Sequence, residues 1–237
     1  MKRWSKMAKT YSRIGKDVVI AIREGGSPEP ETNARLRAVL QNAKALNVPK
    51  DLITRAIKKA TDKDTSDYKE VTFEGYGPHG IAVFVEAATD NNQRTVANIR
   101  SYFNKCNGSL GTSGSVSYMF DHQCFFKINK GDIDPEELEL ELIDHGAEEV
   151  FVEDADEEEQ DQSTKIVIYG DFTNFGSLQS ALEGMGHEII SSGMERIPNV
   201  TKELSGDAVA DVEKLLERIE EDDDVQNVFH TMVEADN

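Results

Sequence analysis

The sequence lacks any long apolar run: the longest stretches are Val18 to Ile22 and Ile81 to Val85. A membrane-spanning helix needs about 20 mostly apolar residues, so none is predicted. No signal peptide is visible, because Met1 is followed by charged and polar residues without an apolar segment. The acid-free stretch before Asp17 also resembles a transit peptide, but its apolar stripe continues to Ile22 and favours a helix of the fold. We therefore expect a soluble, cytoplasmic protein with no membrane partner.

Groups that carry chemistry are also scarce. The two cysteines, Cys106 and Cys124, have no partner at metal or redox spacing, which predicts free, packed thiols in a reducing compartment. The five histidines are scattered, and none has a Cys, Asp or second His at ligand spacing on a predicted helix face. We therefore predict no catalytic site, no metal, no cofactor and no small-molecule substrate, and expect that the protein is not an enzyme.

Two glycine patterns lack the context that phosphate-binding motifs require. Gly75, Gly77 and Gly80 formally match G-x-G-x-x-G, but Pro78 and a strand follow instead of a helix, so a wide hairpin loop is predicted. The loop with Gly108, Gly111 and Gly114 is not followed by Gly-Lys-Ser/Thr. A plain turn is the favoured interpretation, and a loop that offers backbone N–H groups to phosphate oxygens is the alternative.

Positive charge is scarce overall but concentrated at one end. The chain has 26 Lys and Arg against 45 Asp and Glu, a net charge of −19. Residues 1–60 contain 14 basic and 5 acidic residues, so this segment is +9 and residues 61–237 carry −28. Such a division predicts a basic module that contacts polyanions, joined to an acidic body that avoids them.

The basic segment has the pattern of three helices. Apolar residues from Met7 to Ile22 recur at helical spacing, and Gly25-Gly26 ends this first helix. Further helices are predicted at about 33–46 and, after Pro49 at a first turn, to about Ala60. This arrangement is compatible with a helix-turn-helix. We predict a basic helical domain at 1–64 and a polar linker at 61–67 that leads to the next domain.

The acidic part alternates strands and helices. Strands are predicted at 70–74, 81–85 and 115–120, with a helix at 89–107. A βαββαβ unit follows, and an acidic loop joins its two middle strands. Its strands are predicted at 124–128, 149–153, 164–169 and 187–192, and its helices at 135–145 and 174–185. A helix at 207–220 and a strand at 225–232 follow. The predicted fold is multi-domain α+β: the three-helix domain precedes two α+β domains, and the ferredoxin-like one (123–195) is inserted in the other (65–122 plus 196–237).

Several motifs in fixed order resemble the YebC/PmpR family, which includes the mitochondrial translational activator of cytochrome c oxidase. They are Arg35-Leu36-Arg37, Asn47-Val48-Pro49-Lys50-Asp51, Arg55-Ala56-Ile57-Lys58-Lys59, Glu74-Gly75-Tyr76-Gly77-Pro78, Thr89-Asp90-Asn91 with Arg94-Thr95-Val96, and Leu110-Gly111-Thr112 with Gly114-Ser115-Val116. The resemblance covers most of the chain. It implies three domains, one inserted in another, and a non-enzymatic role in gene expression. Bacterial members are commonly labelled DNA-binding transcriptional regulators, and others act in translation on the ribosome.

The first residues depart from the family pattern. Members usually begin with a Gly-x-Ser-Lys-Trp segment and a longer basic arm. In this sequence Met1 is followed by Lys2-Arg3-Trp4-Ser5, so the order of Trp and Ser differs and the arm is missing. We expect an in-frame basic extension upstream of Met1 in the gene.

The leading hypothesis is a nucleic-acid-binding regulator of gene expression, most like a DNA-binding transcriptional regulator. Predicted phosphate contacts come from nine basic residues: Arg35, Arg37, Lys44, Arg55, Lys58 and Lys59, with Lys9, Arg13 and Lys16 behind them. The choice rests partly on the family-like motifs at 35–37 and 55–59. One alternative is a translation factor that docks on ribosomal RNA and the ribosome through the same surface. Another is a protein-binding adaptor, which internal pairing of the basic residues with the acidic domains would favour.

Overall fold

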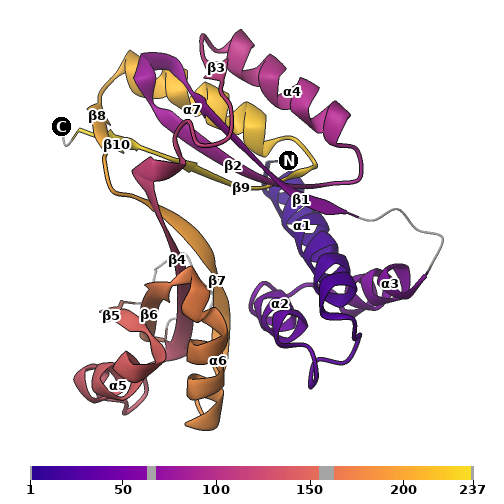
Figure 1. Cartoon of the computed structure of the whole chain (residues 1–237), viewed down its shortest axis with the longest axis vertical. Helices are drawn as coiled ribbons and strands as arrows, with labels where there is room; N and C mark the ends of the chain where they lie inside the picture. Colours follow the sequence, from indigo (N-terminus) through magenta and orange to yellow (C-terminus); the bar gives the residue numbers. More distant parts are fainter. Residues whose placement is uncertain (1, 63–67, 155–162, 236–237) are drawn as a thin grey trace. The chain divides into compact units, whose positions relative to one another are not determined.

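The computed structural model describes residues 2–62, 68–154 and 163–235 (Figure 1). Contacts divide the chain into a first unit, residues 1–20, 55–121 and 196–237, and a second unit, residues 21–54 and 122–195. The N-terminal helices are shared between these two units, so an independent domain at 1–64 stays a prediction. The predicted linker at 61–67 and the predicted acidic loop lie largely outside the described residues.

The three predicted N-terminal helices are present as α1 (Lys2–Gly25), α2 (Ala34–Ala45) and α3 (Lys50–Thr61). Gly26 has a φ of 68°, and its N–H bonds to the Ile22 carbonyl at 2.9 Å, which ends α1 in a conformation that glycine adopts readily. Asn33 caps α2, because its side chain accepts the Leu36 N–H at 3.0 Å.

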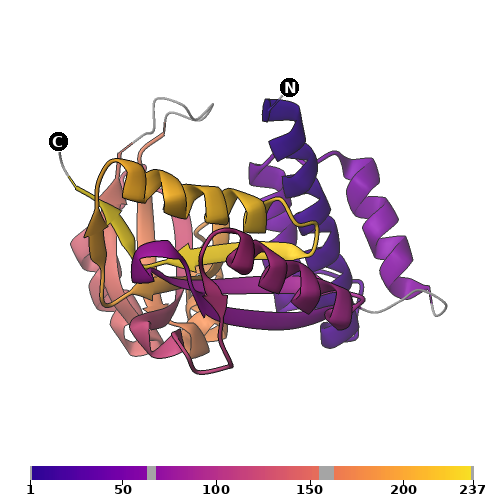
Figure 2. The same cartoon turned by 90° about the horizontal axis from the view of Figure 1, so that it is seen from above.

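The first unit contains a four-stranded sheet in the order β3-β1-β2-β9. Its strands are β1 (Lys69–Tyr76), β2 (Ala82–Thr89), β3 (Ser109–Leu110) and β9 (Val225–His230). The 3-10 turn η1 (Pro78–Gly80) joins β1 to antiparallel β2, which confirms the predicted hairpin. Helices α4 (Asn92–Lys105) and α7 (Asp207–Glu220) cover one face of this sheet (Figure 2). Their buried residues, with Phe103 and Leu215 fully buried, form one apolar core with the strands.

The second unit contains the predicted βαββαβ arrangement. Its sheet has the order β5-β6-β4-β7, with β4 (Phe120–Asn129), β5 (Ala147–Glu153), β6 (Lys165–Asp171) and β7 (Ile189–Pro198). The helices are α5 (Pro135–Leu142) and α6 (Phe175–Gly184), flanked by the 3-10 turns η3 (Ile143–His145) and η4 (Phe172–Asn174). Phe126 and Ile168 from the strands pack with Leu138 and Leu178 from the helices in a separate core.

The predicted strand at 115–120 is wrong. Residues 111–116 form a loop, followed by the 3-10 turn η2 (Ser117–Met119), because the Glu74 carboxylate takes the backbone N–H groups of Gly114, Val116 and Ser117, each at 2.8 Å. A strand needs those N–H groups for its ladder.

The C-terminal strand is also divided in two. Thr231 lies between β9 and β10 (Met232–Glu234), and β10 pairs in parallel with β8 (Lys202–Leu204). The Thr231 N–H bonds to the Ala82 carbonyl, and the Thr231 carbonyl accepts the Lys202 N–H at 2.7 Å. The short β8 was not predicted. Within the described residues, no helix is long and apolar enough to cross a bilayer.

Candidate nucleic-acid interface

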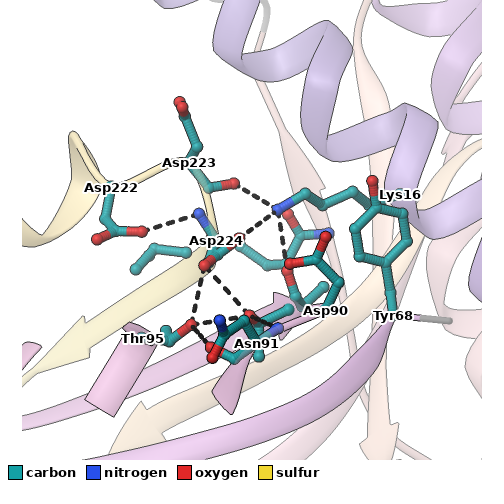
Figure 3. Close-up of polar contacts among 12 residues, drawn as sticks. Lys16, Tyr68, Asp90, Asn91, Thr95, Asp222, Asp223 and Asp224 are labelled. Carbon is teal, nitrogen blue, oxygen red and sulfur yellow. Dashed lines mark hydrogen bonds and ion pairs between the residues drawn. The ribbon is translucent and has the colours of Figure 1, made fainter. Parts of the chain in front are cut away.

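Helix α1 is fixed to the first unit by a buried polar cluster centred on Asp224 (Figure 3). The Lys16 ammonium donates to the Asp224 carboxylate at 3.0 Å, and to the carbonyls of Asp223 at 2.6 Å and Ala88 at 2.9 Å. The other Asp224 oxygen accepts from Arg94 at 2.7 Å and from Thr95 at 2.8 Å. Because an ammonium has three hydrogens and Lys16 is buried, we remove Lys16 from the proposed phosphate contacts.

These bonds also set the ionisation of the cluster. Burial opposes the charged form of Asp224, but the hydrogen bonds from Arg94, Lys16 and Thr95 outweigh it and lower its pKa to about 2. Arg13, one turn before Lys16, donates to the carbonyls of Val225 at 3.0 Å and Glu220 at 3.1 Å. Arg13 is half-buried and burial lowers its pKa. Its guanidinium therefore serves to hold α1 in place, and we also leave Arg13 out of the proposed surface.

Three of the predicted residues lie on α2 in the second unit, each with an acidic partner. Arg37 forms a bidentate pair with Glu183, at 2.7 and 3.0 Å, and also donates to the Pro30 carbonyl. Arg35 pairs with Glu24, and Lys44 pairs with Glu188 at 2.8 Å. The pair at Lys44 is fully exposed and therefore weak, whereas both partners at Arg37 are half-buried.

The remaining four residues belong to the first unit. Arg55, Lys58 and Lys59 are spaced i, i+3 and i+4 on α3, so they lie on one side of that helix. Arg55 and Lys58 are exposed, and Lys59 and Lys9 are half-buried. Lys59 donates to the Tyr68 hydroxyl at 2.6 Å, with its ammonium 4.5 Å from the centre of the ring. We call Lys9, Arg55, Lys58 and Lys59 the basic surface.

A small cavity opens beside the basic surface, between α1 and α3. It has a volume of about 220 Å³. Its lining is Ser12, Gly15, Lys16, Val19, Arg55, Ala56, Lys59 and Tyr68. Three basic side chains line this cavity, and of these Lys16 is paired with Asp224. An anionic group of a polymer such as a phosphate fits this chemistry.

The glycine loop, for which the sequence left a phosphate-binding alternative open, has its backbone N–H groups bonded within the protein. Burial alone would raise the pKa of Glu74, but the three backbone N–H groups of the glycine loop outweigh it and lower that pKa. Those N–H groups are therefore occupied and are not presented to phosphate. Both cysteines are buried and unbridged, and burial raises the pKa of Cys124 to about 11. No set of three His, Cys, Asp or Glu in the described parts is placed to hold a metal ion.

The fold and this site define a class: an α+β protein with basic N-terminal helices and two antiparallel sheets, the second of which is inserted in the chain of the first. The chain belongs to the TACO1/YebC family, as the resemblance predicted. The model of the family's N-terminal domain matches residues 1–63, and the model of its second and third domains matches residues 68–232.

Similar proteins cover nearly the whole chain. A "Probable transcriptional regulatory protein" from Flavobacterium johnsoniae is 65% identical over 99% of this chain and 94% of its own length. One of the same name from Porphyromonas gingivalis is 55% identical over 100% of this chain and 94% of its length. The crystal structure of a conserved hypothetical protein from Aquifex aeolicus matches with a TM-score of 0.76 at 33% identity, covering 97% of this chain and 91% of that one.

Proposed function

We propose that this protein is a non-enzymatic regulator of gene expression that binds nucleic acid through the basic surface. One observation carries the proposal: Arg55 and Lys58 are exposed on one side of α3, next to a cavity whose lining includes Arg55 and Lys59. The names of the bacterial relatives, "Probable transcriptional regulatory protein", support a regulator. Transcriptional regulation on DNA is the function most like theirs.

The charge distribution restricts where a polyanion can bind. Residues 61–237 carry −28 and repel phosphates. Lys16, Arg13 and Arg37 are engaged in internal bonds, so they contribute little to a binding surface. This pairing favours the adaptor hypothesis for those residues. Arg35 and Lys44 also pair with acidic residues, so we rank them behind the basic surface as nucleic-acid contacts.

The composition of α3 supports weak sequence selectivity. Base recognition in the major groove relies largely on Arg, Asn and Gln side chains that reach base edges. Helix α3, KDLITRAIKKAT, offers one such side chain, Arg55, and no Asn or Gln. A structured RNA that offers phosphates in a fixed geometry suits such a surface, so a second candidate function is a translation factor that binds ribosomal RNA on the ribosome.

The two functions are separated by measuring binding to duplex DNA and to ribosomes at the same salt concentration. Wild type is compared with the R55A/K58A variant. Transcriptional regulation predicts sequence-selective duplex binding that the variant loses, without ribosome association. The translation function predicts ribosome association that the variant loses, with only salt-labile, nonselective DNA binding. Unchanged binding of the variant to both targets would refute the basic surface as the site.

A further inference from the structure

The inserted α+β segment has the opposite charge to the basic helices. Residues 123–195 contain three lysines, no arginine and 20 acidic residues, a net charge of −17 out of −19 for the whole chain. A surface in this segment therefore attracts polycations and repels nucleic acid.

The sheet of the second unit has α5 and α6 on one face. On its other face Val167 is buried, whereas Glu149 and Phe151 are exposed. Alternate residues of a strand point to opposite faces, and Cys124, Phe126, Ile166 and Ile168 belong to the core with α5 and α6. The residues between them therefore lie on the other face, which we call the open face.

Three aromatic side chains form a strip across the open face. Phe125 on β4 and Tyr169 on β6 are register partners, with ring centres 6.2 Å apart. On β5, the ring of Phe151 is stacked on Tyr169 at 6.0 Å, with an angle of 13° between the planes. Phe151 is 37% exposed, although it belongs to a well-ordered antiparallel ladder. Such a strip offers ring faces to a partner.

Carboxylates lie next to the strip. Glu149 is the register partner of Tyr169 on β5 and is exposed. Glu195 accepts a hydrogen bond from the Tyr169 hydroxyl at 2.8 Å. Two lysines, Lys127 and Lys165, belong to the same face, and Lys127 bonds to Glu153 at 2.6 Å. Glu149, Glu153 and Glu195 outnumber them, so the border of the aromatic strip is net negative.

We propose that the open face is a docking surface for an arginine-rich, positively charged segment of a partner protein. A guanidinium stacks on an aromatic face and pairs with a carboxylate in the same plane, and the strip with Glu149 and Glu195 provides both interactions. A single-stranded nucleic acid would also stack on the rings, but its phosphates would meet the −17 segment. This surface is independent of the basic surface proposed above.

The test uses the full-length protein and a fluorescent 12-residue peptide of alternating Gly and Arg, with binding followed by anisotropy at about 150 mM salt, where long-range attraction is screened. The E149Q/E195Q variant is expected to weaken peptide binding by about five- to tenfold, from two lost charge pairs. The control E139Q/E141Q makes the same charge change on exposed positions of α5 and is expected to change binding less than about twofold.

Two further variants test the aromatic strip. Tyr169→Leu is expected to weaken the peptide by about threefold or more through loss of the cation–π contact. Because Tyr169→Leu also removes the hydrogen bond to Glu195, Phe151→Leu at the exposed end provides a second measurement with the same expected direction. The R55A/K58A variant is expected to bind the peptide as wild type does, which keeps this proposal distinguishable from the proposed function.

Three results would overturn the docking surface. One is no peptide binding at all, and another is an equal loss in the E139Q/E141Q control, which indicates nonspecific attraction to the acidic segment. The third is binding of a labelled oligo-uridine RNA that Tyr169→Leu abolishes, which would make the strip a base-stacking platform instead.

Discussion

Lys9, Arg13 and Lys16 follow one another at helical spacing on α1, yet their environments differ. Arg13 and Lys16 are held by carbonyls and by Asp224, whereas Lys9 is half-buried near the N-terminal end of the described helix. Residues at i, i+4 and i+7 share one helix face whether that face binds a ligand or packs on a sheet. The sequence therefore predicted the helix but not the role of its basic face.

A comparison of two lysine variants tests this difference in role. Lys16→Met is expected to destabilise the fold by about 2–4 kcal/mol, because Asp224 stays buried with one cationic partner fewer. Lys9→Met is the matched control and is expected to cost less than about 0.5 kcal/mol. Chemical denaturation of both variants measures the difference, and equal stability of the two would refute the structural role of Lys16.

The Asp224 cluster also predicts a pH dependence of stability. The pKa of Asp224 is about 2 in the folded state, below the ordinary value of an aspartate, so the unfolded state binds more protons. Its contribution, roughly 2 kcal/mol, is full above about pH 4 and is lost as the pH falls toward 2. The Asp224→Asn variant should lack this component, so the difference in unfolding free energy from wild type should shrink between pH 5 and 2. A difference that stays constant over this range would contradict the assignment.

At the scale of elements, the periodicity of apolar residues predicted helices and strands correctly where local sequence determines the structure. The three N-terminal helices, the β1-β2 hairpin and the βαββαβ order were all predictable from apolar spacing and turn residues. The pattern Ser115 to Phe120 alternates like a strand, but a distant carboxylate, Glu74, captures the backbone N–H groups that a strand would use. Strand β8 is three residues long and gives no periodic signal.

Removal of the Glu74 carboxylate is expected to release the loop at 111–117. Glu74→Gln keeps the shape but weakens three charge-assisted bonds to backbone N–H groups, at a cost of about 1–3 kcal/mol. Faster hydrogen exchange at Gly114, Val116 and Ser117 should accompany this loss. Glu70→Gln, at an exposed position of the same strand, is the control. Unchanged protection of the three amides in Glu74→Gln would refute the role of the carboxylate.

At the scale of the whole molecule, the order of elements predicted an insertion, but it did not predict which charges pair. Arg37 meets Glu183 and Lys16 meets Asp224 across 146 and 208 residues of sequence. Local patterns carry no information on such contacts, so the sequence ranked Arg37 among the first six candidates although its side chain bonds internally. In the folded protein, Arg55 and Lys58 are exposed together on one side of α3, whereas the exposed Lys44 lies on α2.

The inserted segment has a complete core of its own. Its buried cluster, from Cys124 to Ile189, draws on strands and helices of the segment alone. We therefore predict that an isolated fragment of residues 120–198, which keeps β4 and β7 whole, unfolds cooperatively in urea. A noncooperative transition, together with loss of near-ultraviolet circular dichroism, would show that the fragment depends on the rest of the chain.

The central claim, that Arg55 and Lys58 contact phosphates, is tested most directly by the salt dependence of binding to duplex DNA. Each phosphate contact adds about 0.9 to the slope of log affinity against log salt. The R55A/K58A variant should therefore lose roughly 2 units of slope relative to wild type. The control variant R35A/R37A removes the same charge from α2, where both arginines pair with carboxylates. Thermal melts first confirm that this variant is folded. The slope measured for it should differ from that of wild type by less than about 0.5. An unchanged slope in R55A/K58A, or an equal loss in R35A/R37A, would contradict the account.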